Sequence, residues 1–131
     1  MLNNLLLSTA YFAPISYYAI LLQSRNCQTE IYEHFIKQSI RNKCSIYGAN
    51  GKLDLTVPKK RKGSSKKIIK EIQISYKENW QKEHWNSITS SYNSSPYFKY
   101  YKNKFLPFFE EKEVLLINLN RRIQKLILQL L

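Results

Sequence analysis

The segment 32–58 brings a carboxylate, two cations, an amide and a thiol together within a short stretch of chain. These side chains belong to Glu33, Lys37, Arg41, Asn42 and Cys44. An arginine beside an asparagine can hold an anion or a carbonyl group, because the planar guanidinium fork matches carboxylate and phosphate geometry. On a helix the four-residue spacing of the charged groups would give a self-supporting ladder, whereas a bent segment would let them converge on a ligand. The residue types therefore indicate a polar binding site but do not name a reaction.

Two further side chains of the sequence have the chemistry for proton transfer or nucleophilic attack. His84 follows Trp80 by four residues, so the two can share one helix face, and an imidazole titrates near neutrality. The alternative is a partly buried histidine packed against the indole. Cys44 could act as a nucleophile beside His84 or His34, but its alternating apolar surroundings favour a small buried hydrophobe. For Glu33, desolvation in an aromatic pocket would raise the pKa toward neutrality.

The first half of the chain predicts strands and one helix. An apolar run at 5–7 predicts a buried strand, apolar positions at helical spacing predict a helix over 15–23, and a second strand is expected at 29–32. A strand–helix–strand order favours a parallel pair. Residues 41–47 and 52–57 alternate polar and apolar around an Asn-Gly turn, which predicts a β-hairpin with one buried face.

The second half of the chain is mostly helical by pattern. Residues 59–67 form a basic loop and 68–74 a weak strand or connector, after which helical spacing predicts a helix over about 78–92. The aromatic segment 97–109 is interrupted by a proline and should hold one short helix. The clearest helix is 110–131. These elements predict a single α+β domain, 1–131, with a small mixed sheet in the N-terminal half and helices of the C-terminal half packed on it.

The charge of the chain favours an acidic partner, but its composition also has a simpler explanation. The 131 residues carry a formal net charge of +12, and most of the cations are lysine. Such a balance suits phosphates, nucleic acid or an anionic membrane surface. An AT-rich genome would give the same lysine-rich composition with no functional cause. The run KKRKGSSKK at 59–67 could follow a nucleic-acid backbone, although it has no interleaved aromatics to stack on bases.

Several classes of site are disfavoured by what the sequence lacks. With three glycines in total, neither a dinucleotide fingerprint nor a phosphate-binding loop can be formed. The two cysteines, Cys27 and Cys44, form no metal-binding motif with the histidines, and Asp54 is the single aspartate. The apolar start is too interrupted for a membrane span and has no basic leader. We therefore expect no metal, no cofactor, reduced thiols and a cytoplasmic location.

Four segments of the sequence, in this order and at these spacings, resemble the WbqC-like protein family over essentially the whole chain. They are LLLSTAYFAPISYYA, EIYEHFIKQSIRNKCSIYGANGKLDLTVP, IQISYKENWQKEHWNSITSSYNSSPYFKYY and LPFFEEKEVLLINLN. The form is especially similar to members from Bacteroidetes-type bacteria. Residues that match the family's recurring positions are Pro14, Tyr17, Glu33, Lys37, Arg41, Asn42, Pro58, Trp80, His84, Tyr92, Pro96 and Tyr97.

The resemblance implies a function in bacterial cell-envelope polysaccharide synthesis. The family takes its name from a protein of O-antigen biosynthesis described as a glycine transferase, which would attach an aminoacyl group to an amino sugar. We therefore expect a group-transfer protein that binds a sugar or acyl donor. Its expected proton-transfer residues are Glu33 and His84. Its expected substrate-binding residues are Lys37, Arg41, Asn42, Tyr17, Trp80 and Tyr92.

Two departures from the family pattern keep other functions open. Lys43 stands where the family has a second arginine, so the planar fork is lost. Members usually continue into a further C-terminal segment, whereas this sequence ends at Leu131. If that segment completes the pocket, the chain would be an inactive remnant. A non-catalytic domain that binds nucleic acid or another polyanion through its basic loop is the remaining alternative.

Overall fold

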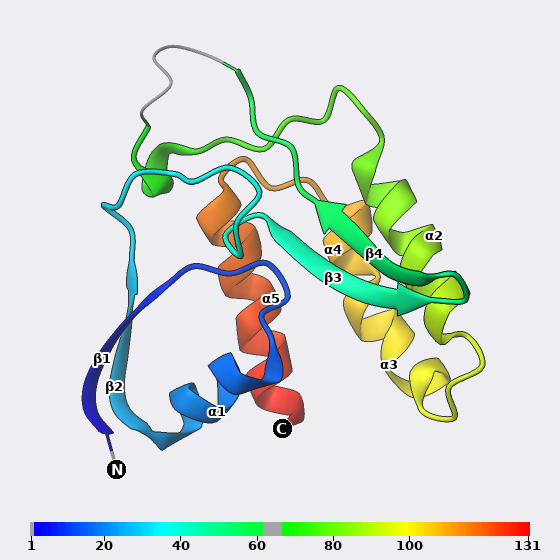
Figure 1. Cartoon of the computed structure of the whole chain (residues 1–131), viewed down its shortest axis with the longest axis horizontal. Coiled ribbons are helices and arrows are strands. Elements are labelled where there is room, and N and C mark those ends of the chain that lie inside the picture. The colour runs from blue at the N-terminus through cyan, green and yellow to red at the C-terminus, as the bar shows by residue number, and fades with distance from the viewer. Residues whose placement is uncertain (1, 62–66) are drawn as a thin grey trace.

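The computed structural model describes residues 2–61 and 67–131 and has its strands in the N-terminal half and most of its helices in the C-terminal half (Figure 1). The first half holds β1 (Leu2–Ser8), α1 (Ile15–Gln23), β2 (Ser24–Glu30), β3 (Lys43–Gly48) and β4 (Gly51–Thr56). The second half holds the short 3-10 helix η1 (Ile69–Glu71), α2 (Trp80–Tyr92), α3 (Phe98–Phe105), α4 (Pro107–Glu110) and α5 (Leu116–Leu130). The predicted α+β class is confirmed.

The strands form two separate two-stranded sheets. β1 and β2 pair in parallel around α1, which confirms the expected strand–helix–strand unit. The strand expected to be buried at 5–7 is not, since Leu6 is 59% exposed and neither Leu5 nor Leu7 is buried. The second strand was expected at 29–32, but β2 begins at Ser24, directly after the last turn of α1. Its outward residues are exposed and its sequence is polar, so β2 carries no apolar alternation by which it could be recognised.

The predicted hairpin is confirmed, and its turn depends on a glycine. β3 and β4 pair in antiparallel register, with Ile46 opposite Leu53 and Gly48 opposite Gly51. Ile46 is buried while Leu53 is 42% exposed, so the buried face of the hairpin narrows toward its tip. Gly51 closes the turn at φ 107°, a conformation that L side chains rarely adopt.

The helices of the second half differ from the predicted ones in two places, at Pro107 and at the start of α5. Helix α2 begins after Asn79, whose side chain accepts a hydrogen bond from the amide of Lys82. Pro107 does not simply interrupt the aromatic segment, because it begins α4 directly after α3 and so gives two short helices there. Helix α5 starts at Leu116, not at 110, since Leu115 pairs with Gln73 in an isolated antiparallel bridge.

The core joins the hairpin, η1, α2, α4 and α5. Figure 1 shows α5 between the β1–β2 pair and the hairpin, with α2 alongside the hairpin. The most deeply buried apolar side chains of the core are Tyr11, Val57, Ile69, Ile72, Ile74, Leu116, Leu119 and Ile123.

None of the helices in the described ranges is both long enough and apolar enough to cross a membrane. The predicted basic loop falls largely on residues 62–66, outside the described part of the chain.

The hairpin turn gives the first prediction, which concerns stability. Gly51→Ala should destabilise the fold by about 1–2 kcal/mol, because alanine is strained at positive φ even though nothing lies within 4 Å of its added Cβ. Gly48→Ala is the matched control. Its Cβ would meet only the Oγ of Ser91 at 3.3 Å, and a serine side chain can rotate away. Equal effects of the two substitutions in chemical denaturation would contradict this account of the turn.

Candidate functional site

Glu33 and Arg41 form a bidentate ion pair that is hydrogen-bonded to Ser8 at the end of β1. Arg41 Nε donates to Glu33 Oε1 at 2.7 Å, and Nη2 donates to Oε2 at 2.9 Å. Nη2 also donates to the Oγ of Ser8 at 3.2 Å, while Ser8 donates to Glu33 Oε2 at 3.3 Å. The chain between β2 and β3 is bent, so Glu33 and Arg41 meet without forming a helical ladder, while Lys37 is exposed. The pair therefore locks that loop to the parallel strands.

The pKa of the Glu33 carboxyl is shifted in the opposite direction to that expected from burial alone. Hydrogen bonds from the Arg41 guanidinium hold the pKa of the Glu33 carboxyl below its ordinary value and outweigh the effect of desolvation. The expected rise toward neutrality is wrong, because the sequence did not reveal how closely Arg41 approaches. Glu33 is therefore ionised at neutral pH, and it orients Arg41 more readily than it donates a proton.

The residues that follow the ion pair are fixed by buried amides from two directions. Asn42 Nδ2 donates to the carbonyl of Val57 at 3.0 Å, and the amide of Val57 donates back to the carbonyl of Asn42 at 2.7 Å. From α5, Asn120 Nδ2 donates to Thr9 Oγ1 at 3.0 Å and to the Arg41 carbonyl at 2.9 Å. Asn120 was not predicted. Its signal is an amide on the apolar face that begins at Leu116, one turn earlier in the same helix.

His84 is a buried bridge between three parts of the chain. Its Nδ1 lies 2.8 Å from the Tyr11 hydroxyl and its Nε2 lies 3.1 Å from the carbonyl oxygen of Thr56. A carbonyl can only accept, so the ring proton is on Nε2, and Tyr11 donates to Nδ1. Desolvation lowers the pKa of His84 to about 4, partly opposed by the Thr56 carbonyl. This arrangement favours a neutral imidazole that positions Tyr11.

Of the other predicted site residues, one lines the two spaces described below, which are formed by residues in the described ranges. Trp80 is buried, donates from Nε1 to the Ser75 carbonyl at 3.0 Å and packs edge-on against His84. Tyr17 is also buried and donates its hydroxyl to the Ser8 carbonyl at 2.6 Å. Lys37 is exposed on the loop before Arg41. Tyr92 is the exception, since it lies at the end of α2 and lines a cavity. Trp80 and Tyr17 are therefore buried side chains with hydrogen-bonded polar groups, and neither lines the two spaces described below.

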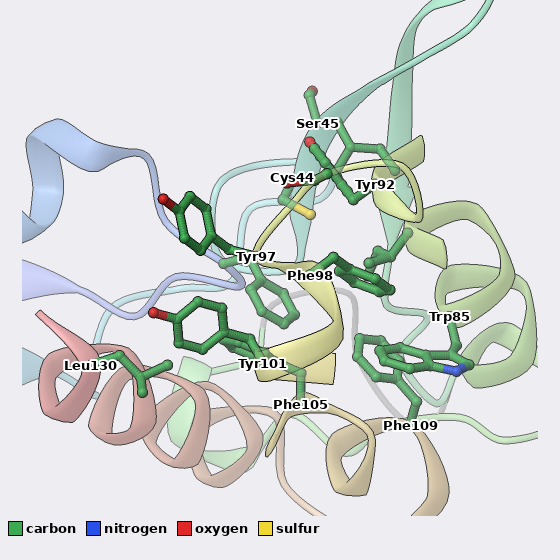
Figure 2. Close-up of a pocket in the computed structure, with 14 residues that line it drawn as sticks. Cys44, Ser45, Trp85, Tyr92, Tyr97, Phe98, Tyr101, Phe105, Phe109 and Leu130 are labelled. Atoms are coloured by element: carbon green, nitrogen blue, oxygen red, sulfur yellow. The ribbon is translucent and has the colours of Figure 1, made fainter. Parts of the chain in front are cut away.

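An aromatic cavity of about 510 Å³ lies between the hairpin and helices α2, α3 and α4 (Figure 2). We use this name for the space whose walls include Ile46, Trp85, Ile88, Phe98, Phe105 and Phe109. Trp85 and Phe109 pack with ring centroids 5.3 Å apart, and Trp85 and Phe98 with centroids 6.2 Å apart. Its volume is within the range of small-molecule sites. These segments are far apart in sequence, so the cavity could not be found from local patterns.

A polar cleft of about 570 Å³ adjoins the aromatic cavity. Its distinctive lining residues are Pro14, Gln38, Ser39, Arg41 and Lys43. Phe12, Cys44 and Ser45 line both spaces and so form their shared wall. The cleft is lined by two cationic residues, and none of its lining residues among those described carries a carboxylate. Together the two spaces suit a ligand with one apolar part and one polar or anionic part.

The wall between the cavities contains unusual backbone. Phe12 has φ 45° and Gln38 has φ 50°, and both residues line the polar cleft. Positive φ is costly for a bulky residue and is often retained at functional sites. The neighbouring amide of Tyr11 donates to the Ile40 carbonyl at 2.9 Å, and the Phe12 ring stacks on Phe109 at 6.1 Å. The loop around Phe12 is therefore held from both sides in a strained form.

Cys44 lies in this shared wall but is poorly suited to attack a substrate. Burial, with a smaller contribution from Asp54, raises the pKa of the Cys44 thiol to about 12, so it stays protonated at neutral pH. This supports the interpretation of Cys44 as a small apolar side chain. Within the described residues, no group of three or more potential metal ligands comes together.

The comparison with known proteins gives one match. The model of the WbqC-like protein family matches residues 10–131 of the chain, which include the ion pair, the buried histidine and the walls of both cavities. No curated protein and no solved structure matches the chain.

The ion pair gives a prediction for a double-mutant cycle. Glu33→Gln and Arg41→Ala should show a coupling of about 2 kcal/mol, because charged hydrogen bonds link side chains that are only 23% and 13% exposed. The matched cycle uses Glu113 and Arg122, where the arginine side chain is 35% exposed, and it should give about 0.2–1 kcal/mol. The measurement is the free energy of unfolding in urea. Equal couplings for the two pairs would refute the special role of Arg41.

The buried histidine gives a prediction for the pH dependence of stability. The unfolded chain takes up the imidazole proton near 6.5, while the folded protein does so only at about 4. The neutral His84 should therefore cost no stability above pH 6.5. As the pH drops to 4, its unfavourable protonation should lower the free energy of unfolding by about 3 kcal/mol. This component should disappear in His84→Gln and persist in His34→Gln, which alters an exposed imidazole. The same pH dependence in all three proteins would contradict the assignment.

Proposed function

The chain belongs to the WbqC-like protein family, and on this premise we propose that it transfers an aminoacyl or related acyl group in bacterial cell-envelope polysaccharide synthesis. The donor and a sugar acceptor would meet where the aromatic cavity joins the polar cleft. The observation that carries the proposal is the continuity of these two spaces through Phe12, Cys44 and Ser45. Sites at which an apolar pocket adjoins a few convergent polar groups are typical of small-molecule enzymes.

The polar cleft supplies the groups that would orient the transferred carbonyl or an adjacent anion. Lys43 Nζ lies 3.6 Å from Asp54, a loose and partly exposed pair that a ligand anion can replace. Arg41 is held by Glu33, so its remaining donor capacity has a fixed direction. In aminoacyl transfer to an amino sugar, an amide bond forms at the sugar nitrogen and the ester or thioester of the donor breaks. The amine proton leaves to solvent, and the leaving group is protonated from solvent.

Within this proposal, Glu33 and His84 are positioning residues. Glu33 keeps Arg41 at the edge of the polar cleft, and His84 keeps Tyr11 in the cleft wall. Both assignments differ from the proton-transfer roles expected from the resemblance. Substitutions of Glu33 or His84 should therefore change the affinity for substrate more than they change the pH dependence of turnover.

The alternative function is electrostatic binding of a polyanion through the basic residues near 59–70. Two of these residues already contact aromatic rings, since Lys59 Nζ lies 5.9 Å from the centroid of Phe35 and Lys70 Nζ 4.7 Å from that of Tyr32. Such contacts leave the ammonium groups available to phosphates. The alternative therefore has to be separated from the proposal by experiment.

The proposal predicts a ligand-dependent thermal shift. The protein at moderate salt would be heated with nucleotide sugars, aminoacyl and acyl thioesters, short RNA and short DNA. A ligand at about 100 times its dissociation constant should stabilise the fold by about 2.7 kcal/mol. We expect a shift with a sugar nucleotide or an acyl donor that is lost in Arg41→Ala and reduced in Arg41→Lys.

The control for this experiment is Arg122→Ala, which removes another arginine paired with carboxylates but away from both cavities. It should leave the ligand shift intact. A shift with nucleic acid alone, abolished by high salt, would sink the transferase proposal and favour the basic segment. A broad melt with no ligand response would favour an inactive remnant.

A further inference from the structure

We propose that the aromatic cavity binds the hydrocarbon chain of a small amphiphile whose anionic head occupies the polar cleft. The chemical class is an acyl or prenyl chain attached to a phosphate or a comparable anion. As a description of the transferase donor or acceptor this rests on the proposed function, but the binding site itself does not. The inference follows from the chemistry of the cavity walls, from their orientation and from the charge of the adjoining cleft.

The aromatic cavity is lined mainly by apolar side chains, and its side-chain hydrogen-bonding groups are the hydroxyls of two serines and three tyrosines and the indole of Trp85. None of its lining residues, all of which lie in the described ranges, is charged. The inner walls, formed by Ile46, Ile88, Phe98, Phe105 and Phe109, offer no side-chain hydrogen bond. A sugar hydroxyl placed there would lose its water partners without replacement, which is unfavourable. A hydrocarbon chain has no such requirement and gains from leaving water.

The orientation of the polar atoms gives the cavity two different ends. Figure 2 shows the hydroxyls of Tyr97 and Tyr101 pointing to the same side, away from Trp85 and Phe109. Tyr97 is 68% exposed, so this side is the wet rim, whereas Phe109 is buried. Cys44, which Figure 2 shows away from Trp85 and Phe109, lines both this cavity and the polar cleft. A chain can therefore extend toward Trp85 and Phe109 while its head stays in contact with water.

The polar cleft favours a negative head. Lys43 and Arg41 line it, and no carboxylate does so among its described lining residues. Asp54 is shared between Lys43 at 3.6 Å and Lys52 at 3.9 Å, so it neutralises neither lysine fully. The Ser39 hydroxyl also lines the cleft and can donate to a phosphate oxygen. Because Glu33 already pairs with Arg41, the loosely paired Lys43 supplies the positive charge that favours an anionic head over a cationic one.

The test is a chain-length series that needs no substitution. Hexyl, octyl and decyl phosphate would be titrated into the full chain by calorimetry, below their critical micelle concentrations. Each added methylene should tighten binding about fourfold until the cavity is filled, as expected for burial of a CH₂ group. Decyl trimethylammonium should bind at least about tenfold more weakly than decyl phosphate. Geranyl phosphate distinguishes a prenyl from an acyl source by comparison with decyl phosphate.

Tryptophan fluorescence locates the chain. Of the two tryptophans in the sequence, Trp85 lines the aromatic cavity, whereas Trp80 is buried against Ser75 and His84. Decyl phosphate should change the emission of the wild type. This change should vanish in Trp85→Phe, although calorimetry still detects binding. Ile88→Trp should fill the cavity and weaken decyl phosphate at least about tenfold, while Leu22→Trp on an exposed position of α1 should not.

A charge reversal with a matched control tests the head group. Lys43→Glu and Lys52→Glu alter two lysines that pair with the same aspartate, but only Lys43 lines the polar cleft. Lys43→Glu should weaken decyl phosphate at least about tenfold and Lys52→Glu by less than about threefold. Equal losses would overturn the placement of the head.

An affinity that does not depend on chain length would overturn the inference. So would binding of nucleotide sugars that displaces decyl phosphate and alters Trp85 emission without any chain. The two proposals fail separately. A chain-length effect without binding of any sugar or acyl donor leaves the inference standing and removes the transferase, whereas donors that bind through Arg41 with no chain-length effect do the reverse.

Discussion

The hydrogen bonds of the buried His84 side chain connect three segments that lie far apart in the sequence. The imidazole sits between the hydroxyl of Tyr11 and the carbonyl of Thr56, so it links the loop after β1, helix α2 and the end of β4. Burial makes these bonds strong and makes a protonated ring costly. Loss of either bond would leave a polar atom unsatisfied in the core, which fixes both the tautomer and the rotamer.

The consequence of this constraint lies one residue away, at Phe12. Tyr11 is held by His84 and by the Ile40 carbonyl, and the next residue has positive φ with its ring stacked on Phe109. That ring forms the wall shared by the aromatic cavity and the polar cleft. The ion pair of Arg41 with Glu33 fixes the opposite side of the cleft. Many polar groups of the segment 32–58 thus act by holding the residues that line the site in position.

An element of the fold could be predicted from sequence where its apolar and polar residues follow a regular pattern. The alternation of the hairpin was sufficient to predict its strands. For the helix over 15–23 the pattern predicted the bounds but not the buried face, because Ile15 and Leu22 are exposed and only Tyr17 and Tyr18 are buried. Strand β2 escaped because its outward residues are polar, and the start of α5 was placed too early because Leu115 belongs to a bridge with Gln73. Of the predicted site residues, Arg41 and Tyr92 line the two spaces, but the sequence did not reveal the spaces themselves, because their walls come from distant segments. The pKa of Glu33 was misjudged because its sign depends on the distance to Arg41.

The most direct test of this account is nitrogen-15 NMR of the two histidine rings, assigned by comparison with His34→Gln. The account predicts that His84 keeps its proton on Nε2 and remains neutral well below pH 6.5, with an Nδ1 resonance that moves in Tyr11→Phe. A His84 ring that titrates near 6.5, or that carries its proton on Nδ1, would contradict it. In that case Tyr11 would not be held by the imidazole, and the wall formed by Phe12 would need another explanation.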